Sequence, residues 1–166
     1  MAKQSSFDLS TGVDLQEVDN AVNNTRKEVQ QRYDFKGTKC TVDFDRHGGS
    51  IVLEGDDEYR VKVLLDVLQS KLIQRKVPLK NVKVGDPEDA AGGRAKIAIS
   101  LAQGLPADTA REIVKAIKGG GFKKVQASIQ ADEVRVSSPS RDELQGVISF
   151  LREKEFGYEL RFGNYR

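Results

Sequence analysis

The chain has 166 residues, of which 38% are apolar and 31% charged, and this composition is typical of a folded globular protein. Lysine and arginine (27) nearly balance aspartate and glutamate (25), giving a net charge of +2. The balance excludes the overall basic excess that non-specific nucleic-acid binding usually needs, so any basic surface must be local.

The single cysteine, Cys40, cannot form an intramolecular disulfide, and no apolar signal region follows Met1. The longest apolar stretches, such as residues 97–102, are too short to span a bilayer. We therefore expect a cytoplasmic protein that is neither secreted nor embedded in a membrane.

Spacing of apolar residues predicts the first elements of the chain. Residues 5–11 alternate as a half-buried strand, with Asp8 among the outward side chains. A helix follows, and Asp14 and Glu17 resemble a capping box at its start. Its apolar face comprises Leu15, Val18, Val22, Val29 and Tyr33.

The rest of the first half predicts a hairpin, a helix and a short strand. These are strands 40–45 and 51–54, a helix capped by Asp56 or Asp57, a strand at 81–84 and a polar connection at 85–93. The second half repeats this order. Its expected elements are a strand at 95–102, a helix at 106–118, strands at 124–130 and 133–137, a helix at 139–153 and a strand at 158–162.

The repeat is most visible in the second helix of each half. Its apolar pairs share an offset of 83 (144 − 61): Val61 with Leu144, Leu64 with Val147, Leu65 with Ile148, and Leu68 with Leu151. We therefore predict an α+β protein of two ferredoxin-like βαββαβ domains, residues 1–90 and 91–166. Each would have a four-stranded antiparallel sheet with two helices on one face.

No catalytic constellation is recognisable. The nearest run to a phosphate loop, residues 119–124, lacks its spacing and is interpreted as a helix cap and turn, with a phosphate cradle as the alternative. His47 is expected in a solvated hairpin tip and Cys40 in the core. Helix capping and solubility explain the acidic runs 56–58 and 88–89. We expect no enzyme activity, metal or cofactor.

The helix-free sheet face offers many hydrogen-bonding groups, which suit either ligand binding or an open, solvated sheet. These residues are Lys39, Thr41, Asp43, Gln126, Ser128, Gln130, Glu133, Arg135, Ser137 and Arg161. Two local basic clusters can meet phosphate or compensate helix dipoles. They are Lys71, Arg75, Lys76, Lys80 and Lys83, and Lys115, Lys118, Lys123 and Lys124.

Short segments along the chain form a recognisable set. They are Ser6-Phe7-Asp8, Arg32-Tyr33-Asp34-Phe35-Lys36-Gly37, Gln103-Gly104, Lys124-Val125-Gln126-Ala127, Ile129-Gln130, Asp132-Glu133-Val134-Arg135-Val136, Ser140-Arg141-Asp142-Glu143-Leu144-Gln145 and Phe162-Gly163-Asn164-Tyr165-Arg166. Together they resemble the YajQ-like family of bacterial proteins over nearly the whole chain. Pro139 departs from the lysine common there in the family; Ser138 is then the expected helix cap, and a cation is lost.

The resemblance implies a cytoplasmic protein of two ferredoxin-like domains that exchange their first strands, residues 5–11 and 95–102. The family is described as nucleotide-binding. Some members bind cyclic di-GMP and influence transcription, and association with guanine nucleotides and tRNA is described for others.

Three functions remain open. The first is a sensor of cyclic di-GMP or a guanine nucleotide, in which cations hold phosphate and Gln or Asp recognises a base edge. Its expected contacts are Arg32, Lys36, Gln130, Arg135, Arg141 and Arg161. The second is an RNA-binding module on the same face, with strong salt dependence. The third is a scaffold that partners a transcription regulator. Arg135 is expected to serve binding more than stability.

Overall fold

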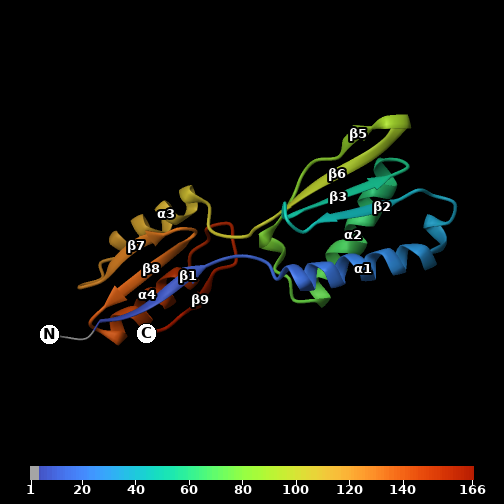
Figure 1. The fold of residues 1–166 in the computed structure, drawn as a ribbon. Helices are drawn as coiled ribbons and strands as arrows, with labels where there is room; N and C mark the ends of the chain where they lie inside the picture. The colour runs from blue at the N-terminus through green and yellow to red at the C-terminus, as the bar shows by residue number, and fades with distance from the viewer. Residues whose placement is uncertain (1–3) are drawn as a thin grey trace. The chain divides into compact units, whose positions relative to one another are not determined.

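The computed structural model describes residues 4–166. Its elements in chain order are β1 (Ser5–Ser10), α1 (Leu15–Gln31), η1 (Tyr33–Phe35), β2 (Thr41–Asp45), β3 (Ser50–Gly55), α2 (Glu58–Gln74), η2 (Leu79–Asn81), β4 (Val82–Val84), β5 (Glu88–Ala90), η3 (Ala91–Gly93), β6 (Arg94–Leu101), α3 (Ala107–Lys118), β7 (Gln126–Gln130), β8 (Glu133–Ser138), α4 (Arg141–Arg152) and β9 (Arg161–Gly163) (Figure 1). The η elements are short 3-10 helices.

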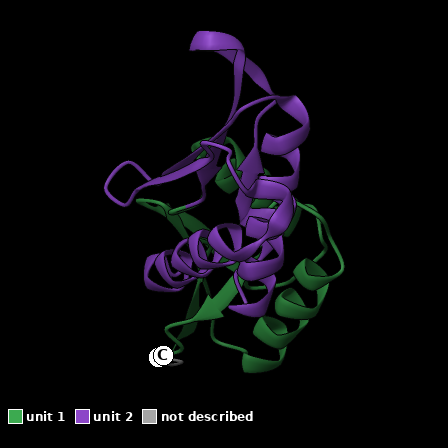
Figure 2. Cartoon of the chain, turned by 90° about the vertical axis from the view of Figure 1, so that its right-hand side faces the viewer, with its two compact units in different colours: residues 1–12, 103–166 green, residues 13–102 purple. Residues whose placement is uncertain are grey.

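The chain divides into two compact units (Figure 2). The terminal unit comprises residues 4–12 and Gln103–Arg166, and the central unit comprises Val13–Ala102. The terminal unit has an antiparallel sheet in the order β7-β8-β1-β9. The central sheet has the order β2-β3-β6-β4, and β5 also pairs with β6.

Strand order makes the two units equivalent, with β2, β3, β6 and β4 corresponding to β7, β8, β1 and β9. Helices α1 and α2 then correspond to α3 and α4. Each unit is therefore a ferredoxin-like arrangement, as the sequence predicts. The predicted apolar stripes form the cores: Val61, Leu64, Leu68, Leu144, Val147, Ile148 and Leu151 are buried, and Leu65 is partly buried.

Several elements differ from the sequence-based expectations. Tyr33 is not on the apolar face of α1, because Arg32 is extended and ends the helix; Tyr33 is 89% exposed. Ser138 is not the cap of α4. It is the last residue of β8 and pairs with Ser5, so Ser140 takes the cap position and its hydroxyl accepts from the N–H of Glu143 at 3.3 Å.

The expected polar connection at 85–93 also contains a strand. Glu88–Ala90 pairs with the first residues of β6 because that strand begins at Arg94 and extends beyond β4. Gly92 and Gly93 form the turn between β5 and β6 with positive φ angles of 74° and 75°, a conformation that favours glycine. In residues 4–166 no helix is long and apolar enough to cross a membrane.

Candidate functional site

The helix-free face of the terminal sheet has an ion pair at its centre. Strand register puts Ser128, Arg135 and Asp8 in one row across β7, β8 and β1. Arg135 Nε donates to Asp8 Oδ1 at 2.9 Å, and the Asn164 amide donates to Oδ2 at 2.5 Å. The Arg135 hydrogen bond lowers the pKa of Asp8, against an opposing effect of burial.

Asp8 therefore differs from the outward, solvated residue that the alternation predicts. Its side chain does lie on the helix-free face, but it is only 8% exposed because Arg135 and Asn164 cover it. Arg135 keeps 36% of its side chain exposed and lines a hollow of about 370 Å³ along β7. This arginine is thus both an ion-pair partner and an accessible cation.

Three of the residues expected to bind ligand share this face but lie on three strands. Gln130 is exposed at the end of β7, where its amide donates to the Ser128 hydroxyl at 3.2 Å. Arg161 is exposed on β9, which lies beyond β1 in the strand order, and is opposite Ser10. With Arg135 on β8 they form a polar surface across the sheet.

Arg32 and Lys36 belong to the central unit. Two nitrogens of Arg32 donate to the Asp34 carboxylate at 2.9 and 2.8 Å, and a third lies 3.5 Å from Glu28. The Asp34 hydrogen bond raises the pKa of Arg32, whose charge is already compensated within its own unit. Lys36 follows η1 and is exposed.

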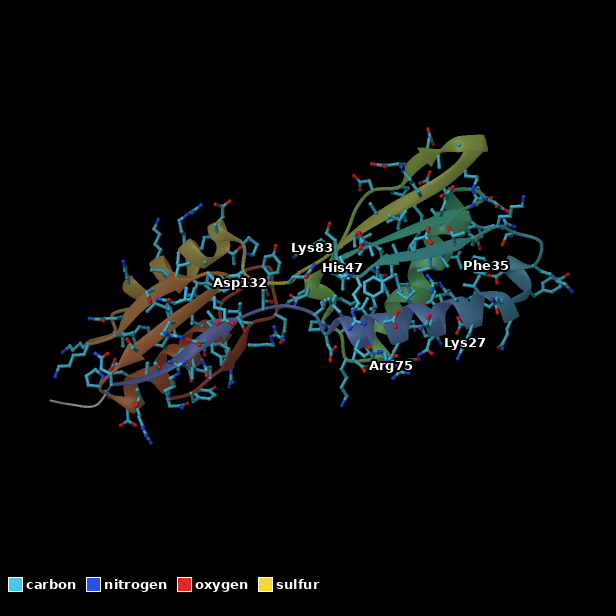
Figure 3. All side chains as sticks on the ribbon, in the orientation of Figure 1. Lys27, Phe35, His47, Arg75, Lys83 and Asp132 are labelled. Carbon is cyan, nitrogen blue, oxygen red and sulfur yellow. The ribbon has the colours of Figure 1, made fainter. Side chains whose placement is uncertain are left out.

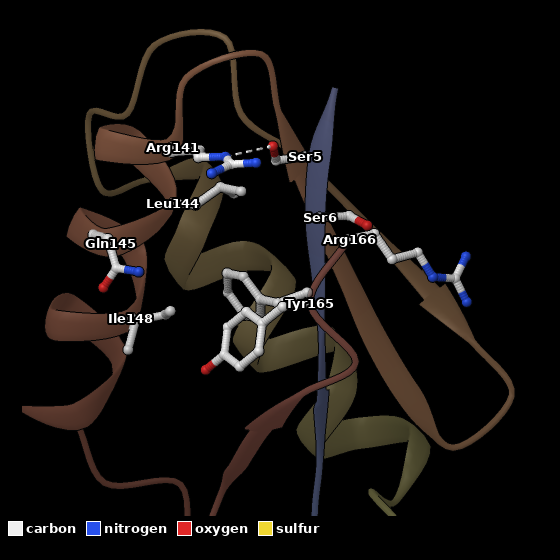
Figure 4. A pocket seen from close by; sticks show the side chains of 9 residues that line it. Ser5, Ser6, Arg141, Leu144, Gln145, Ile148, Tyr165 and Arg166 are labelled. Carbon is white, nitrogen blue, oxygen red and sulfur yellow. Dashed lines mark hydrogen bonds between the residues drawn. The ribbon is translucent and has the colours of Figure 1, made fainter. Parts of the chain in front are cut away.

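Arg141 lies at the rim of a pocket on the helix side of β1 (Figure 4). The pocket has a volume of about 320 Å³. It is lined by Ser5, Ser6, Phe7, Arg141, Leu144, Gln145, Ile148, Tyr165 and Arg166. An apolar lining with a few polar groups is typical of sites for small organic ligands.

Helix α4 supplies one wall of this pocket because its residues recur at helical spacing. Leu144 and Ile148 are buried at the base, and Arg141 and Gln145 are exposed beside them. Arg141 Nε donates to the Ser5 hydroxyl at 3.4 Å, which directs its guanidinium across the pocket toward β1 (Figure 4). The other nitrogens of this guanidinium are available to an anion.

The chain's last residues supply the aromatic wall. Reciprocal backbone hydrogen bonds join Ser6 and Arg166 at 3.2 and 3.0 Å, so the C-terminal tail runs beside β1. This places the Tyr165 ring in the pocket, 6.3 Å from the Phe7 ring centroid and 61% exposed (Figure 4). The Arg166 side chain points away, past β1 (Figure 4).

Gln145 and Tyr165 were not among the site residues expected from the sequence. Both stand in segments that carry the family resemblance, but neither alternation nor helical spacing distinguishes them. Their role depends on the return of the tail to Ser6, a contact over 160 residues (166 − 6) that no local pattern encodes.

The other candidate residues, His47, Cys40 and the first basic cluster, do not come together as a site. His47 is exposed in the turn between β2 and β3 (Figure 3), and Cys40 packs partly buried against the central core. Within residues 4–166 no three His, Cys, Asp or Glu side chains cluster as a metal site would require. In the first basic cluster, Lys71 bonds Glu28 at 2.9 Å, which supports a structural role for that lysine.

The fold and the pocket define a two-unit α+β protein with one arginine-rimmed, aromatic-walled pocket in its terminal unit. Comparison with known sequences agrees with the resemblance. Residues 5–166 match the family described as "Nucleotide-binding protein YajQ-like", and the chain belongs to this family.

Relatives match over nearly their full length. A protein of Alkaliphilus oremlandii named a nucleotide-binding protein is 47% identical over 166 residues, covering 100% of both chains. Another so named, from Koribacter versatilis, is 46% identical over 161 residues, covering 97% of this chain and 96% of its own. A third, from Carboxydothermus hydrogenoformans, is 46% identical and covers 100% of both.

Proposed function

We propose that this protein binds a guanine nucleotide or cyclic di-GMP in the pocket between α4, β1 and the C-terminal tail, and acts by binding without hydrolysing it. The main support is that Arg141, Gln145 and Tyr165 line one pocket of about 320 Å³, whose base is apolar. The names of the family and of its relatives support a nucleotide as ligand.

Each part of a nucleotide has a complementary group in this pocket. The base stacks on Tyr165, because an exposed aromatic ring binds the flat face of any base. The Gln145 amide donates to and accepts from the base edge, as guanine's adjacent acceptor and donors require. The apolar side chains of Leu144 and Ile148 cover the rest of the base.

Arg141 holds the phosphate, since a guanidinium forms paired, charge-assisted hydrogen bonds with phosphate oxygens. It is the first residue of α4, where the helix dipole adds positive potential. Asp142 and Glu143 oppose that potential in the same turn, so the arginine and not the helix end provides most of the attraction. The pocket's volume suits one nucleotide moiety, and the second half of cyclic di-GMP would extend outside it.

A second binding surface is the polar face with Gln130, Arg135 and Arg161. Its groups are spread across three strands, which suits the extended backbone of RNA better than a mononucleotide. Gln130, Arg135 and Arg161 offer no aromatic ring, so such binding would not depend on base stacking. A scaffold for a transcription regulator needs neither surface. We place all three activities in the cytoplasm, since the chain's one cysteine leaves no intramolecular disulfide to require an oxidising compartment.

Calorimetric titration with GMP, GTP, cyclic di-GMP, AMP and a short RNA, each at two salt concentrations, tests the proposal. We expect guanine ligands to bind more tightly than AMP, and their binding to depend only weakly on salt. Arg141→Ala should lower the affinity for guanine ligands about tenfold. Arg46→Ala, which changes an exposed arginine of the β2–β3 turn, is the control.

Two results would contradict the proposal. RNA binding with a steep salt dependence and no affinity for mononucleotides would favour the polar sheet face. Steady phosphate release from GTP above a heat-inactivated control, abolished by a point mutation, would show that the protein is an enzyme.

A further inference from the structure

Strand β7 has a free outer edge. It pairs with β8 on one side, and no strand in the described part of the chain pairs with the other. Gln130 and Glu133 flank a two-residue turn, so they form a hydrogen-bonded pair of the antiparallel ladder. Because hydrogen-bonded and non-hydrogen-bonded pairs alternate, Ala127 and Ile129 direct their backbone N–H and C=O groups away from β8. Ile129 is 44% exposed.

The equivalent strand of the central unit, β2, is protected. Arg26 of α1 donates from Nε to the Val42 carbonyl at 3.1 Å, and a second nitrogen of the same guanidinium donates to that oxygen. A third nitrogen bonds the Asn23 side chain at 3.3 Å. The arginine thereby occupies an outward carbonyl at this edge of the central sheet.

The terminal unit has an arginine at the equivalent position of α3, but this arginine bonds a different partner. Arg111, Asp108 and Ala127 each stand 85 residues after Arg26, Asn23 and Val42 (111 − 26 and 127 − 42). Asp108 replaces the neutral Asn23 with a carboxylate, and Arg111 forms an ion pair with it. Arg111 is thus bonded within α3, and the Ala127 carbonyl stays open to a partner.

A basic groove runs beside this edge. A hollow of about 320 Å³ is lined by Val114 and Ile129, with the cations Arg111, Lys115 and Lys118 around it. A second hollow of about 370 Å³ shares Lys118 with the first, includes Ala127 and adds Arg135 as a further cation. The equivalents of Lys115 and Lys118 in the central unit, Gln30 and Tyr33, are uncharged.

We propose that the β7 edge binds an extended acidic segment of a partner protein, which joins the terminal sheet as an additional strand. Its backbone pairs with Ala127 and Ile129, an apolar side chain contacts Val114 and Ile129, and carboxylates meet the cations of α3. A second copy of this chain is a poor occupant, because two β7 edges would bring like charges together. RNA would leave the outward amides and the apolar floor unused.

Amide hydrogen exchange, followed by NMR on the full-length protein, tests this proposal. The probe is a synthetic peptide of about eight residues that alternates glutamate and valine. Matched peptides alternate lysine and valine, or carry N-methyl groups on the amides that would face β7. We expect the acidic peptide alone to slow exchange at Ala127 and Ile129.

Charge reversal supplies the matched variants. The double variant Lys115→Glu with Lys118→Glu changes only exposed side chains. We expect it to lower the affinity for the acidic peptide at least about tenfold. Lys27→Glu on α1 (Figure 3) is an exposed control in the central unit and should leave affinity unchanged. Thermal unfolding would verify that each variant is folded.

Three outcomes would overturn the proposal. The first is equal binding of the acidic and basic peptides, and the second is that oligouridine, but not the acidic peptide, slows exchange at the Ala127 and Ile129 amides. The third is that a higher protein concentration alone slows exchange at these amides. The second would make the groove a nucleic-acid surface, and the third would make it a self-association surface.

Discussion

Asp8 shows how a single residue can connect distant parts of the chain. Its carboxylate accepts hydrogen bonds from Arg135 and Asn164, which are 127 and 156 positions away. Alternation in the sequence predicts the face on which Asp8 lies, because side chains of a strand alternate. It cannot predict the burial, since this depends on the neighbouring strand and the tail.

Replacing Asp8 with asparagine should lower the free energy of unfolding at neutral pH by about 1–3 kcal/mol, because it removes a buried, charge-assisted hydrogen bond. The pKa of Asp8 is lowered in the folded state, so its ionised form stabilises the fold above its unfolded pKa. This contribution is lost as pH falls through the lowered folded-state pKa. The difference between wild type and Asp8→Asn should therefore shrink in acid.

Denaturant unfolding of both proteins from about pH 7 to about pH 2 measures this difference. Asp43→Asn, which changes an exposed carboxylate of β2, is the control and should have little effect. A difference independent of pH would contradict an electrostatic role for Asp8. Arg135→Ala should also destabilise, since Asp8 would be left buried without its main partner.

The candidate site residues differ in whether their surroundings depend on nearby or on distant parts of the chain. Arg141 could be predicted from its segment, and it lies at the pocket. Arg32 has both of its partners within four residues. Helical spacing brings Glu28 close to it, and the Asp34 pair forms where α1 ends at Arg32. Tyr165 requires the tail to fold back on Ser6.

Helices were the most predictable elements, because apolar stripes and capping residues are local signals. Asp14 and Asp57 cap α1 and α2 through their side chains, as expected. The sequence predicts a start of α4 two residues before the observed one, because Ser138 and Ser140 are equivalent caps on sequence alone. Only the pairing of Ser138 with Ser5 distinguishes them.

Ser140→Ala should lower the free energy of unfolding by about 1 kcal/mol, because the hydroxyl that accepts the Glu143 N–H is lost. The matched control is Ser149→Ala, an exposed position inside the same helix where alanine is the better helix former. Equal effects of the two changes on denaturant unfolding would show that Ser140 does not cap α4.

At the scale of the molecule, the apolar pattern predicts the repeat but not the strand order. Period-two alternation shows which face of a strand is buried, but it does not name the strand's neighbours. In the structure β6 pairs with β3 and β4, and its inward residues complete the central core. These residues are Ala95, Ile97, Ile99 and Leu101.

A fragment of residues 13–102 should fold alone, because it contains every strand and helix of the central unit. A fragment of residues 1–90, cut at the boundary that the polar connection suggests, should not, because it lacks β6. Circular dichroism during thermal unfolding would show a cooperative transition for the first fragment only. A cooperative transition for residues 1–90 would contradict the central place of β6.

The proposed function depends on nucleotide binding in the pocket of the terminal unit. NMR titration of the isotope-labelled full-length protein with GMP tests it most directly, because each amide reports on its own surroundings. We expect the largest shifts at Ser5, Arg141, Gln145 and Tyr165. The proposed site would be wrong if the largest shifts occurred elsewhere. The alternatives are the polar sheet face, at Gln130, Arg135 and Arg161, and the central unit, at Arg32 and Lys36.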